Sequence, residues 1–70
     1  MTEYLVIYET GEDGGWGACS PDLPGCVAVG KTRREVEKLI SEAIPMHIEA
    51  MREAGEPVPE PRHEAGSVAA

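Results

Sequence analysis

Two cysteines and two histidines are the residues of this sequence best suited to bind a metal ion or act as nucleophiles. They are Cys19, Cys26, His47 and His63. Their spacing matches neither the Cys-x₂-Cys nor the His-x₃₋₅-His pattern of zinc sites. We therefore predict no metal site. Without a signal peptide, both thiols are expected to be reduced and to serve as small apolar residues.

The other side chains that could take part in catalysis do not form a catalytic motif either. None of the serines lies in a Gly-x-Ser-x-Gly elbow. Glu9 and Asp22 are at most two of the several carboxylates that a two-metal nuclease needs. The glycine-rich stretch 11–15 lacks the Lys and Ser/Thr of a phosphate loop. His47 lies on an apolar helical stripe, where a core or rim position is expected. The sequence predicts no catalytic residue, no cofactor and no enzyme activity.

Charge narrows the classes of partner. The chain of 70 residues carries 6 basic and 13 acidic side chains, a net charge of −7 with neutral histidines. Nucleic-acid phosphates and anionic membrane surfaces repel such a chain. A basic protein partner is electrostatically favoured, although acidic residues that only maintain solubility explain the same charge.

The length allows one small domain with a marginal core, so self-association as a homodimer or higher oligomer is expected. No apolar run approaches the ~18 residues of a membrane span. The N-terminus lacks the basic-then-apolar pattern of a secretory signal, which predicts a cytoplasmic protein.

Three segments are predicted to form an antiparallel meander. Residues 3–9 are rich in aromatic and β-branched side chains, and residues 16–20 and 26–30 provide the second and third strands. Turn residues in 10–15 predict a hairpin loop. Pro24-Gly25 predicts the centre of a type II turn, with proline presetting φ and glycine accepting a positive value.

One long helix follows the strands. Thr32 and Glu35 form a capping box at its start, and Gly55 ends it. Seven apolar residues and one histidine then recur at spacings of three and four, along one helical face: Val36, Leu39, Ile40, Ala43, Ile44, His47, Ile48 and Met51. Pro45 interrupts the hydrogen bonds but not this stripe, which predicts one bent helix.

The segment after the helix is expected to be extended. Prolines alternate over residues 55–61, which favours a stiff polyproline II conformation. Residues 62–70 are weakly encoded, and Ser67–Ala70 either adds a short edge strand or frays. The predicted class is α+β: a three-stranded antiparallel meander, one long helix on one face, and an optional last strand.

Five blocks of the sequence resemble the HicB-like antitoxin family. They are, in order, Gly14-Gly15-Trp16, the stretch from Ser20 to Cys26, Gly30-x-Thr32 with Glu35, the stretch from Glu42 to Glu49, and the proline-rich stretch from Gly55 to Pro61. We assign the domain to residues 1–61, followed by a weakly structured tail or short edge strand at residues 62–70. The resemblance implies a β-β-β-α-β domain with a partial ribonuclease-H-like fold that is not a nuclease.

The resemblance also implies a partner. Such domains neutralise HicA-like toxins, which are small basic ribonucleases that cleave messenger RNA, by covering them. The acidic charge agrees with a basic partner. The candidate contacts are near the first hairpin and the Pro21–Gly25 turn: Glu12, Asp13, Trp16, Asp22, Leu23 and Pro24. Trp16 fits an exposed anchor and a cap on the core equally well.

The sequence also departs from the family. Many members carry a C-terminal DNA-binding domain, whereas this chain stops at residue 70, so we expect no direct DNA binding. Lys31 stands where the family often has Asp, and Arg33 and Arg34 stand where it has apolar and acidic residues. The alternative to a toxin-neutralising module is a stand-alone homo-oligomeric scaffold or small-ligand-binding domain of the same fold.

Overall fold

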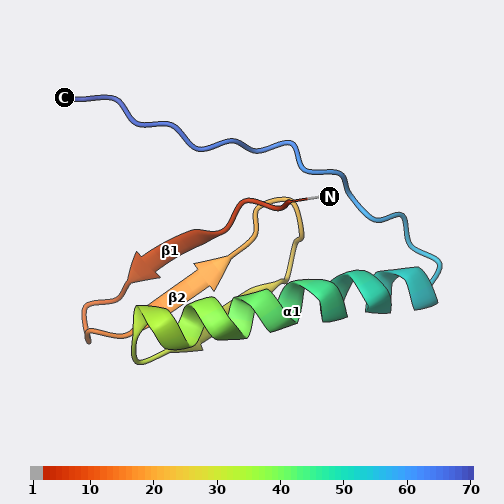
Figure 1. Cartoon of the computed structure of the whole chain (residues 1–70), viewed down its shortest axis with the longest axis horizontal. Coiled ribbons are helices and arrows are strands. Elements are labelled where there is room, and N and C mark those ends of the chain that lie inside the picture. The colour runs from red at the N-terminus through yellow and green to blue at the C-terminus, as the bar shows by residue number, and fades with distance from the viewer. Residues whose placement is uncertain (1–2) are drawn as a thin grey trace.

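Three antiparallel strands and one helix make up the fold. The structure, a computed structural model, describes residues 3–70. Its elements are β1 (Ile7–Thr10), β2 (Trp16–Cys19), β3 (Val27–Gly30) and α1 (Arg33–Glu53). The sheet order is β1-β2-β3, and α1 packs against β2 and β3 on one face (Figure 1). The predicted α+β class and meander are confirmed.

The first strand is shorter than predicted. β1 begins at Ile7, which pairs with Cys19 at the end of β2, and residues 3–6 lie outside the sheet. The reason lies in the partner strand. β2 ends at Cys19, and the Leu23 N–H donates to the Ser20 carbonyl at 3.1 Å in the turn that follows, so β2 does not continue beside residues 3–6.

Glycine conformations define both connections of the sheet. In the hairpin loop, residues 11–15, Gly14 has φ 83° and the Gly11 N–H donates to the Gly15 carbonyl at 2.8 Å. In the second connection, Gly25 has φ 85° and the Cys26 N–H donates to the Leu23 carbonyl at 3.0 Å. A positive φ at the third residue of a closed turn defines type II, as predicted.

Both ends of α1 follow the sequence signals. The Glu35 N–H donates to Thr32 Oγ1 at 3.1 Å. Gly55 adopts φ 73°, and the Glu56 N–H donates to the Met51 carbonyl at 2.9 Å, which is a Schellman stop. The helix runs through Pro45 without interruption, so one helix rather than two is confirmed.

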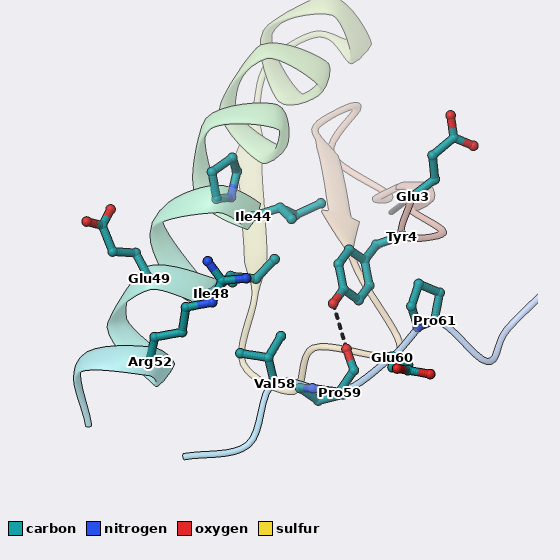
Figure 2. A pocket seen from close by; sticks show the side chains of 11 residues that line it. Glu3, Tyr4, Ile44, Ile48, Glu49, Arg52, Val58, Pro59, Glu60 and Pro61 are labelled. Carbon is teal, nitrogen blue, oxygen red and sulfur yellow. Dashed lines mark hydrogen bonds between the residues drawn. The ribbon is translucent and has the colours of Figure 1, made fainter. Parts of the chain in front are cut away.

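The segment after α1 returns along the molecule as an extended tail, residues 56–70, without helix or strand. The Tyr4 hydroxyl donates to the Pro59 carbonyl at 2.6 Å (Figure 2). An open groove of about 1120 Å³ lies between the tail and the C-terminal half of α1, and Tyr4 lines it. Ser67–Ala70 is exposed, and the optional last strand does not form in the structure.

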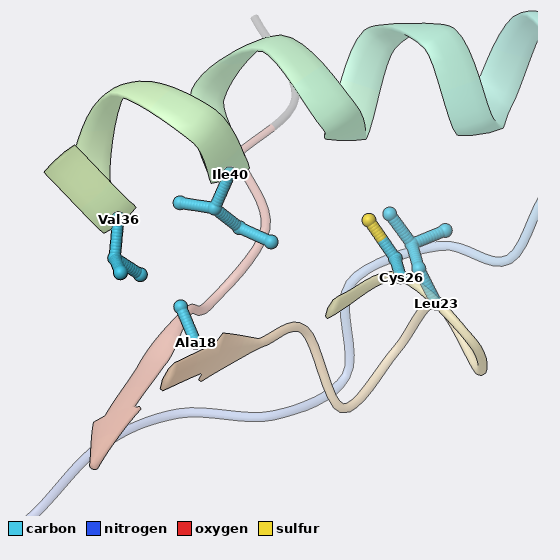
Figure 3. Packing of buried hydrophobic residues seen from close by; sticks show 5 residues of the cluster. All are labelled: Ala18, Leu23, Cys26, Val36 and Ile40. Atoms are coloured by element: carbon cyan, nitrogen blue, oxygen red, sulfur yellow. The ribbon is translucent and has the colours of Figure 1, made fainter. Parts of the chain in front are cut away.

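The core is small and lies between α1 and the sheet. It contains five buried side chains, Ala18, Leu23, Cys26, Val36 and Ile40 (Figure 3). The start of α1 approaches β3 closely, because a Cβ on Gly30 would lie 3.0 Å from both Val36 Cγ2 and the Glu35 side chain. Glycine at this position therefore lets the helix pack against the strand.

Candidate protein-binding surface

The predicted contact residues divide between the two connections that flank β2. Glu12 and Asp13 belong to the hairpin loop, with Trp16 directly after it, whereas Asp22, Leu23 and Pro24 belong to the turn between β2 and β3. These connections lie at opposite ends of β2. The structure therefore forms two separate groups rather than one surface.

The hairpin loop presents its carboxylates to solvent. Glu12 and Asp13 are exposed. Asp13 Oδ1 accepts the Gly15 N–H at 3.0 Å, which fixes the shape of the loop. Trp16 is half-buried and packs against the core cluster. The loop thus holds two negative charges beside an aromatic side chain that is partly accessible.

The turn between β2 and β3 buries its carboxylate instead. Asp22 is 7% exposed, and Leu23 is completely buried. The carboxylate accepts the Arg62 N–H on Oδ1 at 3.1 Å and the His63 N–H on Oδ2 at 3.3 Å. His63 Nδ1 lies 2.7 Å from Oδ1. We call Asp22, Arg62 and His63 the tail clasp.

The tail clasp keeps Asp22 ionised. Burial by itself raises the pKa of this carboxyl, but the hydrogen bonds from the His63 ring and from the N–H groups of Arg62 and His63 outweigh it. The net result is a pKa below its ordinary value. A carboxylate with its oxygens occupied in this way fastens the tail to the β2–β3 turn.

The clasp is the part that sequence reasoning missed. Asp22 and His63 are 41 positions apart, and neither periodicity nor a motif connects them. Pro24, by contrast, is exposed within this turn. It shares a shallow hollow of about 450 Å³ with His47 and Met51, on the side of α1 near its C-terminus. His47 is half-buried there, on the apolar stripe.

The basic start of α1 has contacts within the chain. Arg33 places its guanidinium 4.6 Å from the centroid of the Tyr8 ring. Its Nε lies 3.0 Å from Glu37 Oε1, one helical turn away. Cation–π and i,i+4 pairing therefore account for Arg33 without a partner molecule.

The two cysteines are free, and burial raises the pKa of the Cys26 thiol. Cys26 is thus a protonated core residue. Within residues 3–70, no three His, Cys, Asp or Glu side chains gather as a metal site would require. Within the same range, no helix has the length and apolar character needed to cross a membrane.

The features described so far define a small acidic β-β-β-α domain with an exposed carboxylate loop. Comparison with known proteins identifies its class. The family model described as "HicB_like antitoxin of bacterial toxin-antitoxin system" matches residues 4–69. The chain belongs to this family of antitoxins.

Two relatives are similar over most of their length. The UPF0150 protein Ta0767 of Thermoplasma acidophilum is 40% identical over 57 residues, which cover 81% of this chain and 83% of the relative. The UPF0150 protein ssr1765 of a Synechocystis strain is 41% identical over 56 residues, which cover 80% of this chain and 71% of the relative. The similarity therefore includes nearly the whole domain.

Proposed function

We propose that this chain neutralises a small, basic, HicA-like toxin that cleaves messenger RNA. The family match over residues 4–69 carries the proposal, because members of this family act within toxin–antitoxin systems. The net charge of −7 supports it independently. A ribonuclease binds RNA phosphates with basic residues, and an acidic protein competes for the same surface.

The hairpin loop is the proposed contact. Glu12 and Asp13 are exposed, and the Asp13–Gly15 hydrogen bond holds the loop in shape before the partner arrives. Their carboxylates occupy the places of RNA phosphates on the toxin, and Trp16 supplies apolar contact area. In this proposal Asp22 and Leu23 act indirectly, since they hold the turn that presents Pro24.

The protein is proposed to bind its partner without catalysing a reaction. We place this role in the cytoplasm, where messenger RNA is translated and the free thiols of Cys19 and Cys26 stay reduced. The tail runs on the β1 side of the sheet and in the direction of β1 (Figure 1). We propose that it becomes the last strand of a partial ribonuclease-H-like fold when the partner binds.

Growth rescue tests the function. The gene of a small basic protein from the same genomic neighbourhood is expressed in a bacterial host, alone and together with this chain. The proposal predicts arrested growth and cleaved messenger RNA with the basic protein alone, and normal growth with both. A pull-down of the tagged chain from its native cells should recover the same basic protein in stoichiometric amount.

Two results contradict the proposal. One is a basic protein that arrests growth equally in the presence and absence of this chain. The other is a pull-down at low salt that recovers only this chain, which would favour the stand-alone scaffold.

We also propose that the chain self-associates when no toxin is bound. The supporting observation is that Val27 and Val29, on the face of the sheet opposite α1, are 63% and 75% exposed. A small domain with so little core gains stability when a second copy covers such residues.

A further inference from the structure

The face of the sheet opposite α1 is apolar. Cross-strand partners point to the same side of a sheet, and the row Tyr8–Ala18–Ala28 packs toward the core and α1. The alternate rows therefore point away from the helix. They are Ile7–Cys19–Val27 and Glu9–Gly17–Val29, which we call the outer face. Figure 3 shows Ala18 directed toward α1, opposite to this face.

The outer face has a trough over β2, between the side chains of Ile7 and Glu9 on β1 and the larger ridge on β3. The central strand β2 contributes only the small residues Gly17 and Cys19, whereas β3 contributes Val27 and Val29. The resulting hollow measures about 210 Å³. The valine side chains on β3 are apolar and could fill this trough. Within one chain the ridge lies beside the trough and leaves it open.

A second copy related by a two-fold axis can fill the trough that the ridge of the same chain leaves open. When two outer faces meet, the β3 ridge of each copy lies over the β2 trough of the other, and both contacts form at once. The face is thus complementary to itself.

The distribution of charge favours a second copy of this chain as the partner that binds the outer face. A net charge of −7 makes copies of this chain repel one another over most of their surface. The outer face carries one charged residue, Glu9, among its six positions. Like-charged copies therefore approach most easily here. A basic toxin finds its complementary charge on the hairpin loop instead.

We propose that two copies pack outer face to outer face, with Val27 and Val29 of each filling the trough over Gly17 and Cys19 of the other. This inference rests on the proposed self-association and is independent of toxin binding. Three strands of four residues cover a sheet plane of only about 200 Å² per copy, which is a small patch for an interface. Stable interfaces bury about 800 Å² per partner. The dimer is therefore weak and depends on concentration.

Gly17→Val is the most specific test. A Cβ on Gly17 lies 3.7 Å from the Ala28 carbonyl oxygen, an ordinary contact, and the backbone there needs no glycine. A β-branched residue also suits a strand. The variant therefore preserves the monomer while it fills the trough. It adds apolar surface as well, so non-specific association through a sticky patch would increase.

Two further variants complete the set. Val29→Lys places a charge on the ridge. Met46→Lys is the matched control, because Met46 is 69% exposed on α1, on the other side of the molecule. Thermal unfolding of each variant checks that the fold is intact. If Gly17→Val does not fold, Cys19→Leu fills the same trough.

Sedimentation equilibrium, at protein concentrations up to roughly 1 mM, measures the association. We expect a monomer–dimer equilibrium for the wild type and for Met46→Lys, with dissociation constants at least about tenfold higher for Gly17→Val and Val29→Lys. A wild type that stays monomeric throughout overturns both self-association and this interface. Dimerisation unchanged or tightened by Gly17→Val, or weakened equally by Met46→Lys, overturns the interface alone. Toxin neutralisation in the growth assay stays intact in all these variants.

Discussion

The two connections that flank β2 use acidic residues in opposite ways. In the hairpin loop, the side chains of Glu12 and Asp13 remain exposed. In the turn after β2, Asp22 is buried and accepts hydrogen bonds from Arg62 and His63, which lie far along the chain. An acidic residue in a turn is therefore available to a partner only when its carboxylate oxygens do not already accept hydrogen bonds within the fold.

The largest expected effect on stability comes from a substitution in the buried turn after β2. Leu23→Ala removes a side chain with no solvent exposure from the turn after β2. We expect a loss of about 2–5 kcal/mol in the free energy of unfolding, because the small core cannot fill the cavity. Chemical denaturation measures it. A loss below about 0.5 kcal/mol would show that Leu23 does not hold the turn.

A smaller effect is expected when the tail clasp is broken. Asp22→Asn keeps the shape of the side chain but removes its charge, so the bonds from Arg62 and His63 weaken. We expect faster hydrogen exchange of the Arg62 and His63 amides, with α1 amides nearly unchanged. Asp13→Asn in the hairpin loop is the control, and it should leave exchange in the tail unaltered. Equal exchange in both variants would contradict the clasp.

The clasp also predicts how stability depends on pH. The folded-state pKa of Asp22 lies below its ordinary value of 3.8. Its contribution is therefore fully present above that value and is lost as the pH falls through the folded-state pKa. Denaturation between pH 7 and pH 2 should show a smaller acid-induced loss in Asp22→Asn than in the wild type. Parallel pH profiles for the two proteins would contradict this assignment.

The tail has a second attachment, whose loss should have a modest effect. Tyr4→Phe removes the hydroxyl that donates to the Pro59 carbonyl. We expect a loss of about 0.5–1.5 kcal/mol in the free energy of unfolding, typical of one hydrogen bond. Denaturation of the single variants and of the double variant with Asp22→Asn measures whether the two attachments act together. No loss in any of them would show that the tail does not stabilise the domain.

The sequence predicted the parts of the fold that depend on neighbouring residues. Thr32 and Gly55 mark the ends of α1, and Gly25 marks the type II turn, because caps and turns are decided within a few positions. The predicted start of β1 at residue 3 was wrong, because the strand begins only where β2 can pair with it, at Ile7. The tail clasp was missed for a related reason: His63 reaches Asp22 only through the whole path of the chain.

The candidate contact residues also show that contacts between distant parts of the chain could not be predicted from the sequence. Residue type and position drew Glu12, Asp13 and Asp22 into one group, whereas burial separates them. Burial depends on the tail, which carries little signal of its own. The sequence therefore identified the acidic turns, and the structure distinguished the one whose carboxylates are exposed.

The affinity of two charge-matched variants for the toxin tests whether the hairpin loop is the toxin contact. One variant combines Glu12→Lys with Asp13→Asn in the hairpin loop, and the other combines Glu49→Lys with Glu53→Gln on the exposed side of α1. Both change the net charge equally. We predict that the loop variant binds a catalytically inactive toxin at least about tenfold more weakly at low salt, and that the difference narrows as salt screens the charges. Equal affinities for the two variants would contradict a toxin contact at the hairpin loop.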